Sequence, residues 1–141
     1  MDISDLYKIA DENKIKIYFY PLYPLKSVSL PGNIGIDSLG AVHTEAEEKS
    51  VLAHEIGHCI KGAFYNYKCK YDIKSKYEYK ADKWAIQNII PFDELESALR
   101  SGNTEIWSLA EYFGVTYDFM NKAVELYENR LIELRTAGEQ V

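Results

Sequence analysis

Residues 51–60 read VLAHEIGHCI, a stretch with two histidines four positions apart and a glutamate directly after the first. On an α-helix such residues lie on one face, so His54 and His58 can direct their imidazoles to a common point. Glu55 lies beside this face, where its carboxylate can reach a water molecule on a metal ion rather than the ion itself. A catalytic Zn²⁺ takes three protein ligands and keeps one position open, so a third ligand must come from elsewhere in the chain.

The neighbours of the histidine pair favour a metal site over a helix that carries two histidines by chance. Val51, Leu52 and Ile56 give the pair an apolar setting, in which partly buried imidazoles need polar partners. Gly57 removes a side chain between the two histidines, which allows another element to approach the helix closely.

Residues 78–82, EYKAD, supply the candidate third ligand twenty residues after the second histidine. Glu78 and Asp82 are again four apart and share a helix face, beside a stripe suited to packing against the first helix. That packing would aim Glu78 at the metal, while Asp82 would accept the second ring N–H of a ligating histidine, His54 being the preferred one. The alternatives are a solvated acidic face formed by both residues, or a helix-capping role for Glu78 alone. The adjoining stripe consists of Ala81, Trp84 and Ala85.

The first 43 residues predict a short helix and a small sheet. Apolar residues recur at helical spacing in residues 2–14, and residues 15–20 are β-branched and aromatic. Residues 27–37 form two extended pieces around a turn that contains Pro31, Gly32 and Asn33. We therefore expect an antiparallel sheet of about three strands.

Two capped helices are expected over residues 44–90. Thr44 has the capping-box spacing for a helix that ends before Gly62. After a loop over residues 63–74, Ser75 repeats the capping spacing for a second helix, which Pro91 ends.

Further helices are expected over residues 91–135. Pro91 suits the first position of one helix, Thr104 can cap the next, Gly114 ends it, and Thr116 opens a last helix that runs to about residue 135. The order of elements predicts an α+β fold with C-terminal helices. No linker or repeat divides the chain, so we expect one domain over 1–141, with parts 1–43, 44–90 and 91–135.

The motifs resemble those of a known family. HEIGH at residues 54–58, EYKADKWA at 78–85 and IIP at 89–91 are similar to the ImmA/IrrE metallopeptidases, in which HExxH precedes an E-x-x-A-[DN]-x-[FW]-A helix and a proline. The order HExxH then ExxxD is also that of the gluzincins. The resemblance extends weakly over residues 1–135. Lys80 stands where many relatives have an acidic residue, which we interpret as a surface difference.

The resemblance implies a minimal zincin-like domain that cleaves a specific protein. By this likeness His54, His58 and Glu78 would bind Zn²⁺, and Glu55 would be the catalytic base. The implied substrate is a helix-turn-helix repressor of a phage or integrative element. A donor for the developing oxyanion is also expected. The candidates, each with packing as its alternative role, are His43, Tyr65, Tyr67, Tyr71 and Tyr117.

Two further interpretations stay open: a non-catalytic module that binds a repressor, and a DNA-binding regulator. Residues 106–124, IWSLAEYFGVTYDFMNKAV, resemble a helix-turn-helix. Residues 104–135, however, carry six acidic and three basic residues, and only Lys122 lies near the start of the second helix. We therefore interpret this segment as a hairpin that covers the metal-site helices or docks substrate.

The composition also limits the classes of binding partner that we expect. A net charge of −6 argues against non-specific nucleic-acid binding. The sequence shows no secretory signal and no apolar run of about 18 residues, so we expect a cytoplasmic protein without a membrane partner. Cys59 and Cys69 are then expected to be reduced thiols, with metal ligation as the lesser alternative. Nothing in the sequence indicates an oligomeric state.

Overall fold

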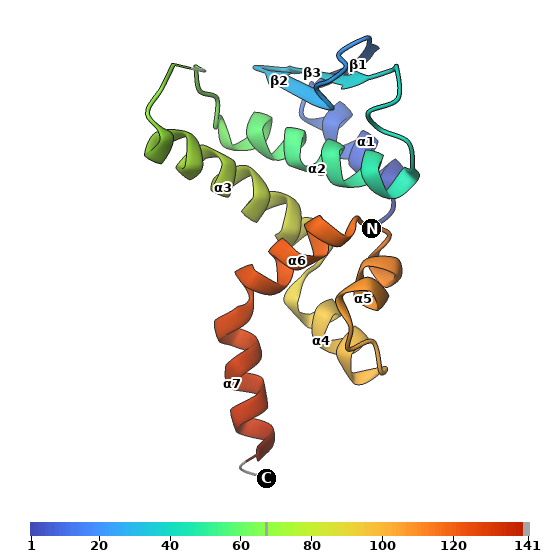
Figure 1. Ribbon diagram of the computed structural model, residues 1–141, viewed down its shortest axis with the longest axis vertical. Helices are drawn as coiled ribbons and strands as arrows, with labels where there is room; N and C mark the ends of the chain where they lie inside the picture. The colour runs from blue at the N-terminus through green and yellow to red at the C-terminus, as the bar shows by residue number, and fades with distance from the viewer. Residues whose placement is uncertain (67, 140–141) are drawn as a thin grey trace.

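A small sheet and two long helices form the N-terminal part of the protein, and shorter helices complete it. The computed structural model describes residues 1–66 and 68–139. Figure 1 shows the sheet and α1 on one side of α2, with α3 beside α2 and α7 leading away from the body. This is the expected α+β class. The elements are α1 (Ile3–Glu12), β1 (Lys16–Tyr20), β2 (Ser27–Leu30), β3 (Asn33–Asp37), α2 (Glu45–Lys61), α3 (Tyr71–Ile89), α4 (Phe92–Arg100), α5 (Ile106–Phe113), α6 (Tyr117–Leu126) and α7 (Glu128–Glu139).

The sheet is mixed, so the expectation of a purely antiparallel sheet was wrong. Its strand order is β1-β3-β2, with β2 antiparallel to β3 and β1 parallel to β3. Pro21 and Pro24 prevent a tight hairpin between β1 and β2, because proline lacks a backbone donor and fixes its own φ. The short turn at Pro31 and Gly32 then returns β3 between the two earlier strands.

The inner face of the sheet closes the core over α2. Ile34 and Ile36 of β3 are buried, as are Leu6 of α1 and Leu52 and Ile56 of α2. Burial of such side chains contributes roughly 1.5–3 kcal/mol each. The metal-motif helix is therefore held along its length by the sheet and by α1, which fixes the direction of its other faces.

The expected ends of α2 are present. The Thr44 hydroxyl accepts a hydrogen bond from the Glu47 backbone N–H at 3.1 Å, and Gly62 ends the helix at φ 60°. The capping box is not reciprocal, because the Glu47 carboxylate accepts from the backbone N–H of His43 instead.

The start of α3 differs from the expectation. The helix begins at Tyr71, so the loop covers residues 63–70 and Ser75 lies inside the helix rather than at its cap. Asp72 provides negative charge in the first turn, where the helix dipole favours it. No side chain caps the Lys70 position, and the Glu78 carboxylate faces the histidines instead of its own helix terminus.

The C-terminal helices follow the expected turn residues in part. Gly114 ends α5 at φ 68°, and the Thr116 hydroxyl accepts from the Phe119 backbone N–H at the start of α6. Thr104 does not cap α5, whose N-cap residue is Glu105 without a side-chain bond. No helix in the described part of the chain has the length and apolarity that a membrane crossing needs.

The last helix was expected to be continuous but breaks at Tyr127. This residue lies between α6 and α7 and is buried, and its hydroxyl donates to the Ile90 carbonyl at 2.8 Å. Its ring also meets Phe92 edge to face. Anchoring of Tyr127 against the α3–α4 connection therefore accompanies the change of helix direction.

Candidate metal centre

Close contact between α2 and α3 brings the motif residues together. A Cβ added to Gly57 would lie 2.5 Å from the Ala81 carbonyl oxygen, so only glycine allows this approach. Ala81 and Ala85 are fully buried. The expected close approach at Gly57 is present, and it sets Glu78 one turn before the contact point, facing the histidine pair.

Three potential ligand atoms converge at one place. His54 Nε2 lies 3.1 Å from His58 Nε2 and 2.8 Å from Glu78 Oε2, and the distance from His58 Nε2 to Glu78 Oε2 is 3.4 Å. A tetrahedral Zn²⁺ with ligands at about 2.0–2.2 Å separates its ligand atoms by about 3.3–3.6 Å. The His54–His58–Glu78 cluster therefore needs shifts of only a few tenths of an ångström to hold such an ion.

The other ring nitrogens show which atoms face the cluster as electron-pair donors. His58 Nδ1 lies 2.6 Å from the Ala63 carbonyl oxygen, which can only accept, so Nδ1 carries the proton. His54 Nδ1 lies 2.7 Å from Asp82 Oδ1, which favours the same tautomer. In the neutral rings both Nε2 atoms then present lone pairs to each other and to Glu78. Such an arrangement fits a cation between them.

The charges around the cluster attract a proton when no metal is bound. Burial alone would lower the pKa of His54, but the Asp82 and Glu78 carboxylates raise it to about 9. Hydrogen bonds from His54 and then His58 hold the pKa of Glu78 far below its ordinary value. The centre therefore favours a positive charge at the place where a metal ion would sit.

Glu55 lies next to the cluster without joining it. Its side chain is buried, and Oε1 is 3.8 Å from His54 Nε2. It lines a cavity of about 250 Å³ together with His58, Phe64, Tyr65 and residues of β2. A carboxylate in this position can exchange a proton with a molecule bound beside the cluster.

The fold and this centre agree with a family comparison. Residues 32–125 match the peptidase M78 family model, described as the IrrE N-terminal-like domain. The chain belongs to the peptidase M78 family. Comparisons with curated proteins and with solved structures give no match.

The matched segment of this M78 peptidase domain extends from the turn between β2 and β3 to Glu125, one residue before the end of α6. It includes the metal cluster, Glu55 and Asp82. Membership in a peptidase family indicates a protein substrate.

Among the candidate oxyanion donors, the structure brings Tyr65 to the candidate metal centre of this M78 peptidase domain. Its hydroxyl donates to Glu78 Oε1, and burial followed by the Glu78 carboxylate raises the pKa of Tyr65. Tyr71 and Tyr117 are exposed, and His43 lies before α2, near Gly40. Tyr67 lies outside the described residues.

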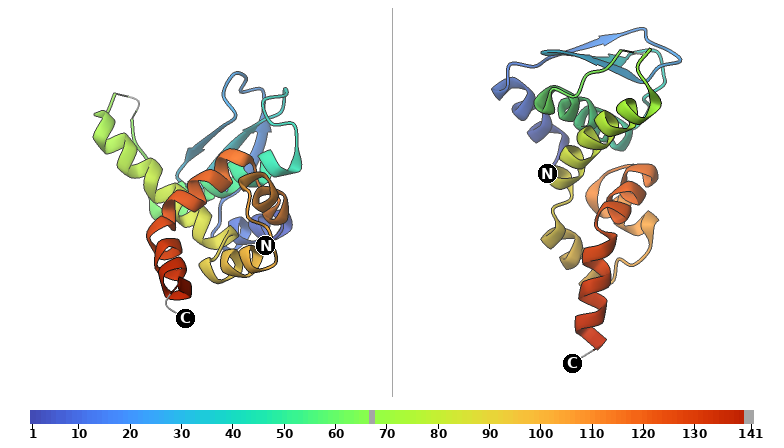
Figure 2. Two further views of the ribbon diagram at one scale, coloured as in Figure 1. Left: turned by 60° about the horizontal axis from the view of Figure 1, so that its bottom comes forward. Right: turned by 90° about the vertical axis from the view of Figure 1, so that its left-hand side faces the viewer.

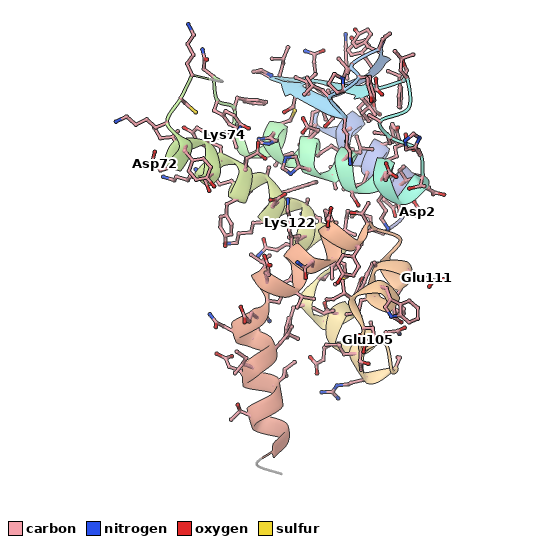
Figure 3. The ribbon with its side chains drawn as sticks, viewed as in Figure 1. Asp2, Asp72, Lys74, Glu105, Glu111 and Lys122 are labelled. Carbon is pink, nitrogen blue, oxygen red and sulfur yellow. The ribbon has the colours of Figure 1, made fainter. Side chains whose placement is uncertain are left out.

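Lys122 of α6 also lies beside the candidate metal centre, a position that the sequence did not predict. Its Nζ is 3.5 Å from Asp82 Oδ2, the carboxylate that holds His54. Figure 3 shows Lys122 where α6 passes α3. With Phe119 and Asp118 it lines a groove of about 320 Å³ that also contains His54. The only sequence signal was its isolated positive charge in the acidic C-terminal segment.

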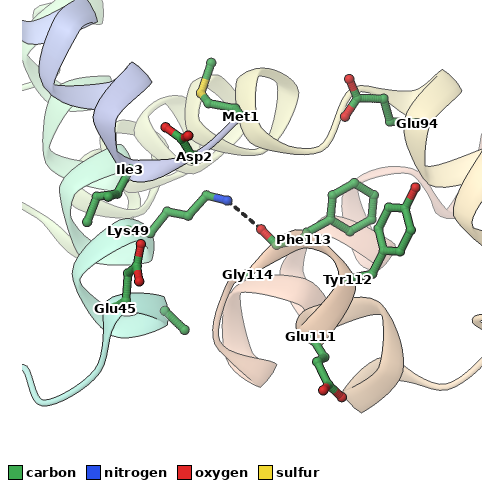
Figure 4. Close-up of a pocket in the computed structure, with 11 residues that line it drawn as sticks. Met1, Asp2, Ile3, Glu45, Lys49, Glu94, Glu111, Tyr112, Phe113 and Gly114 are labelled. Carbon is green, nitrogen blue, oxygen red and sulfur yellow. Dashed lines mark hydrogen bonds between the residues drawn. The ribbon is translucent and has the colours of Figure 1, made fainter.

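Two hydrogen bonds hold the α5–α6 turn of this M78 domain against α2. The buried Lys49 ammonium donates to the Phe113 carbonyl at 2.6 Å (Figure 4), and the Thr116 backbone N–H donates to the Ser50 hydroxyl at 3.1 Å. Burial lowers the pKa of Lys49. Because α2 also carries the two histidines, these bonds fix α6 as a wall of the groove beside the cluster.

Proposed function

We propose that this protein is a zinc-dependent endopeptidase in which His54, His58 and Glu78 hold the ion and Glu55 is the general base. The observation that carries the proposal is that one ligand atom each of His54, His58 and Glu78 face one another. The Nδ1 atoms of the two histidines are already hydrogen-bonded, one to the Asp82 carboxylate and the other to the Ala63 carbonyl. Membership in the peptidase M78 family supports it.

The chain's own residues have separate tasks in this proposal. Zn²⁺ would supply Lewis acidity, which polarises a peptide carbonyl and lowers the pKa of water at an open position. Glu55 accepts the proton of the attacking water and delivers it to the leaving nitrogen. Asp82 orients the His54 ring. The Tyr65 hydroxyl, held protonated beside Glu78, would turn its single O–H from Glu78 to the developing oxyanion.

The shape of the cleft supports cleavage inside a chain rather than at its end. The groove of about 320 Å³ lies on the His54 side of the cluster, and the cavity of about 250 Å³ lies on the His58 side. Ser27 of β2 lines both. In the described residues β2 pairs with β3 alone, so its second edge can hydrogen-bond an extended peptide that passes the cluster in both directions.

The resemblance to ImmA/IrrE peptidases extends this proposal to a substrate. We propose that the substrate is a helix-turn-helix repressor of a phage or integrative element and that it is cut in the cytoplasm. We also propose that residues 1–141 act as a single peptidase domain. Since α6 contributes Lys122 and Phe119 to the groove beside the metal cluster, we assign the C-terminal helices to the same peptidase domain.

One substitution tests the reaction. Glu55→Gln removes the proton acceptor and keeps the side-chain shape, so we expect zinc to stay bound and cleavage to cease. The wild type and this variant would be co-expressed with a candidate helix-turn-helix repressor of a phage or integrative element, and repressor fragments would be sought by mass spectrometry. Glu45→Gln, an exposed change on the same helix, is the matched control and should leave cleavage intact.

The two alternatives give different results in the same system. A non-catalytic repressor-binding module would inactivate the repressor even with Glu55→Gln. A DNA-binding regulator would bind duplex DNA with a steep salt dependence. Against the latter, the side chains that α6 presents outward line grooves beside the cluster and include Asp118 and Glu125, which repel phosphate.

A further inference from the structure

The outer face of the sheet is apolar and exposed. It is formed by Tyr18 and Tyr20 of β1 and by Val28 and Leu30 of β2, which are 39%, 49%, 41% and 61% exposed. None of the described helices covers it, as the right-hand view of Figure 2 shows. Soluble proteins expose single apolar residues freely, but a contiguous set indicates a binding surface.

The side chains of this outer sheet face form one continuous surface. The central strand contributes Gly35, where an added Cβ would lie 3.3 Å from Val28 Cγ1 and 3.4 Å from Leu22 Cδ1. Neighbouring side chains therefore close over β3 from both sides. The Tyr18 and Tyr20 rings stack with centroids 5.7 Å apart and planes at 13°, which joins them into one aromatic pair on this face.

The charge of this part of the chain is opposite to that of the whole protein. Residues 13–36 contain Lys14, Lys16 and Lys26 and no acidic residue, whereas the complete chain has a net charge of −6. Asp37, which ends β3 and pairs with Tyr20, is buried, and its carboxylate accepts hydrogen bonds from three backbone N–H groups. Lys16 shares the face of Tyr18 by strand alternation. The surface therefore suits a partner whose apolar side chains are flanked by carboxylates.

The outer sheet face adjoins the cleft through a single strand. All four residues of β2 line the 250 Å³ cavity beside Glu55: Ser27 and Ser29 from the inner side of the strand, and Val28 and Leu30, which also belong to the outer face. A protein held in the cleft thus needs to cross only the free edge of β2 to reach the outer face.

We propose that the outer sheet face is an exosite that binds an acidic, amphipathic segment of the protein substrate, separate from the segment that is cut. This inference rests on the proposed peptidase function. The exosite supplies binding to the folded substrate, and the cleft needs to recognise only a short extended stretch. Tyrosine suits this role because it offers a large contact area at a small cost in conformational entropy.

The test compares an intact substrate with a short one. The double variant Tyr18→Ser/Tyr20→Ser would be assayed on the helix-turn-helix repressor of the co-expression test and on a peptide spanning its cleavage site. We expect KM for the intact repressor to rise at least about tenfold, equivalent to about 1.4 kcal/mol, with no change for the peptide. Tyr18→Phe/Tyr20→Phe should behave as wild type. Tyr112→Ser, an equally exposed tyrosine on α5, is the matched control.

Other outcomes overturn the exosite. They are an unchanged KM for the repressor, or an equal loss on repressor and peptide. Wild-type dimerisation or binding to phosphatidylserine vesicles that the Ser variants abolish would assign the surface to a different partner and also overturn it.

Binding by the inactive Glu55→Gln protein separates this inference from the peptidase proposal. If the wild type cuts nothing, but Glu55→Gln protein binds the repressor and the Ser substitutions weaken that binding, the exosite stands and the peptidase proposal fails. If the Ser substitutions leave this binding unchanged while cleavage proceeds in the wild type, the exosite fails and the peptidase proposal stands.

Discussion

Gly57 of α2 lies directly against the Ala81 carbonyl of α3, so close that a methyl group at position 57 would come within 2.5 Å of the oxygen. The contact sits between His54 and His58 in sequence and one turn from Glu78 on the facing helix. The distance between the two helices at this point therefore decides whether the Glu78 carboxylate reaches the imidazoles.

Gly57→Ala should push the helices apart and weaken metal binding. The added methyl meets backbone, which cannot move aside as a flexible side chain can, so we expect a loss of roughly 1–3 kcal/mol in stability. Helix propensity alone predicts the opposite sign, a gain of up to about 1 kcal/mol. Urea unfolding of the metal-free protein distinguishes the two. Zinc affinity, measured by competition with a chelator, should fall at least about tenfold if Glu78 is displaced.

Asp82→Asn should lower zinc affinity while leaving the fold intact. The Asp82 carboxylate accepts from His54 Nδ1 at 2.7 Å, and its loss removes both the charge and the fixed tautomer of the ring. Changes in such supporting partners cost about 10- to 100-fold in metal affinity. Asp72→Asn, an exposed change near the start of the same helix, is the control. Equal zinc affinity in the two variants would show that Asp82 does not support the ligand.

Most features that the sequence predicted are set within one helix or turn. The common face of His54 and His58 and the ends of α2 depend on local geometry, which the residue spacing contains. The contact at Gly57 and the approach of Glu78 and Asp82 to the histidines join two helices, and they were predicted because the histidine motif needs a third ligand from elsewhere in the chain. The start of α3 was missed because four helix-compatible residues, 71–74, precede Ser75, and a capping residue inside a favourable run does not end it.

Other features that depend on distant contacts could not be read from the sequence. The parallel pairing of β1 with β3 follows from where the chain returns, not from strand pattern. Tyr65 was one of five candidates because its place beside Glu78 depends on the path of the loop over residues 63–70. Lys122 reaches Asp82 across 40 positions of sequence, through the docking of α6 on α2 and α3.

Tyr65→Phe should reduce kcat and leave zinc bound. If the Tyr65 hydroxyl donates to the developing oxyanion, its loss affects the transition state more than the bound substrate, and we expect kcat to fall about 100-fold or more with KM little changed. Tyr77→Phe is the matched control, because Tyr77 stacks on Tyr65 with centroids 6.3 Å apart. A normal kcat with weaker zinc binding would instead assign Tyr65 to the support of Glu78.

The metal-free protein should lose stability as the pH rises. The pKa of His54 is raised from 6.5 to about 9 by Asp82 and Glu78, so the protonated ring stabilises the fold relative to the unfolded chain. The sign follows from linkage: this contribution is complete below about pH 6.5 and is lost as the pH passes through about 9. Urea unfolding at about pH 6 and about pH 10 measures it, with His54→Gln as the variant in which this component should vanish.

Zinc binding replaces the proton on His54, so calorimetry near pH 7 in buffers of different ionisation enthalpy should detect the release of about one proton per zinc. Zinc binding without proton release would contradict the assignment of the bound proton to this centre.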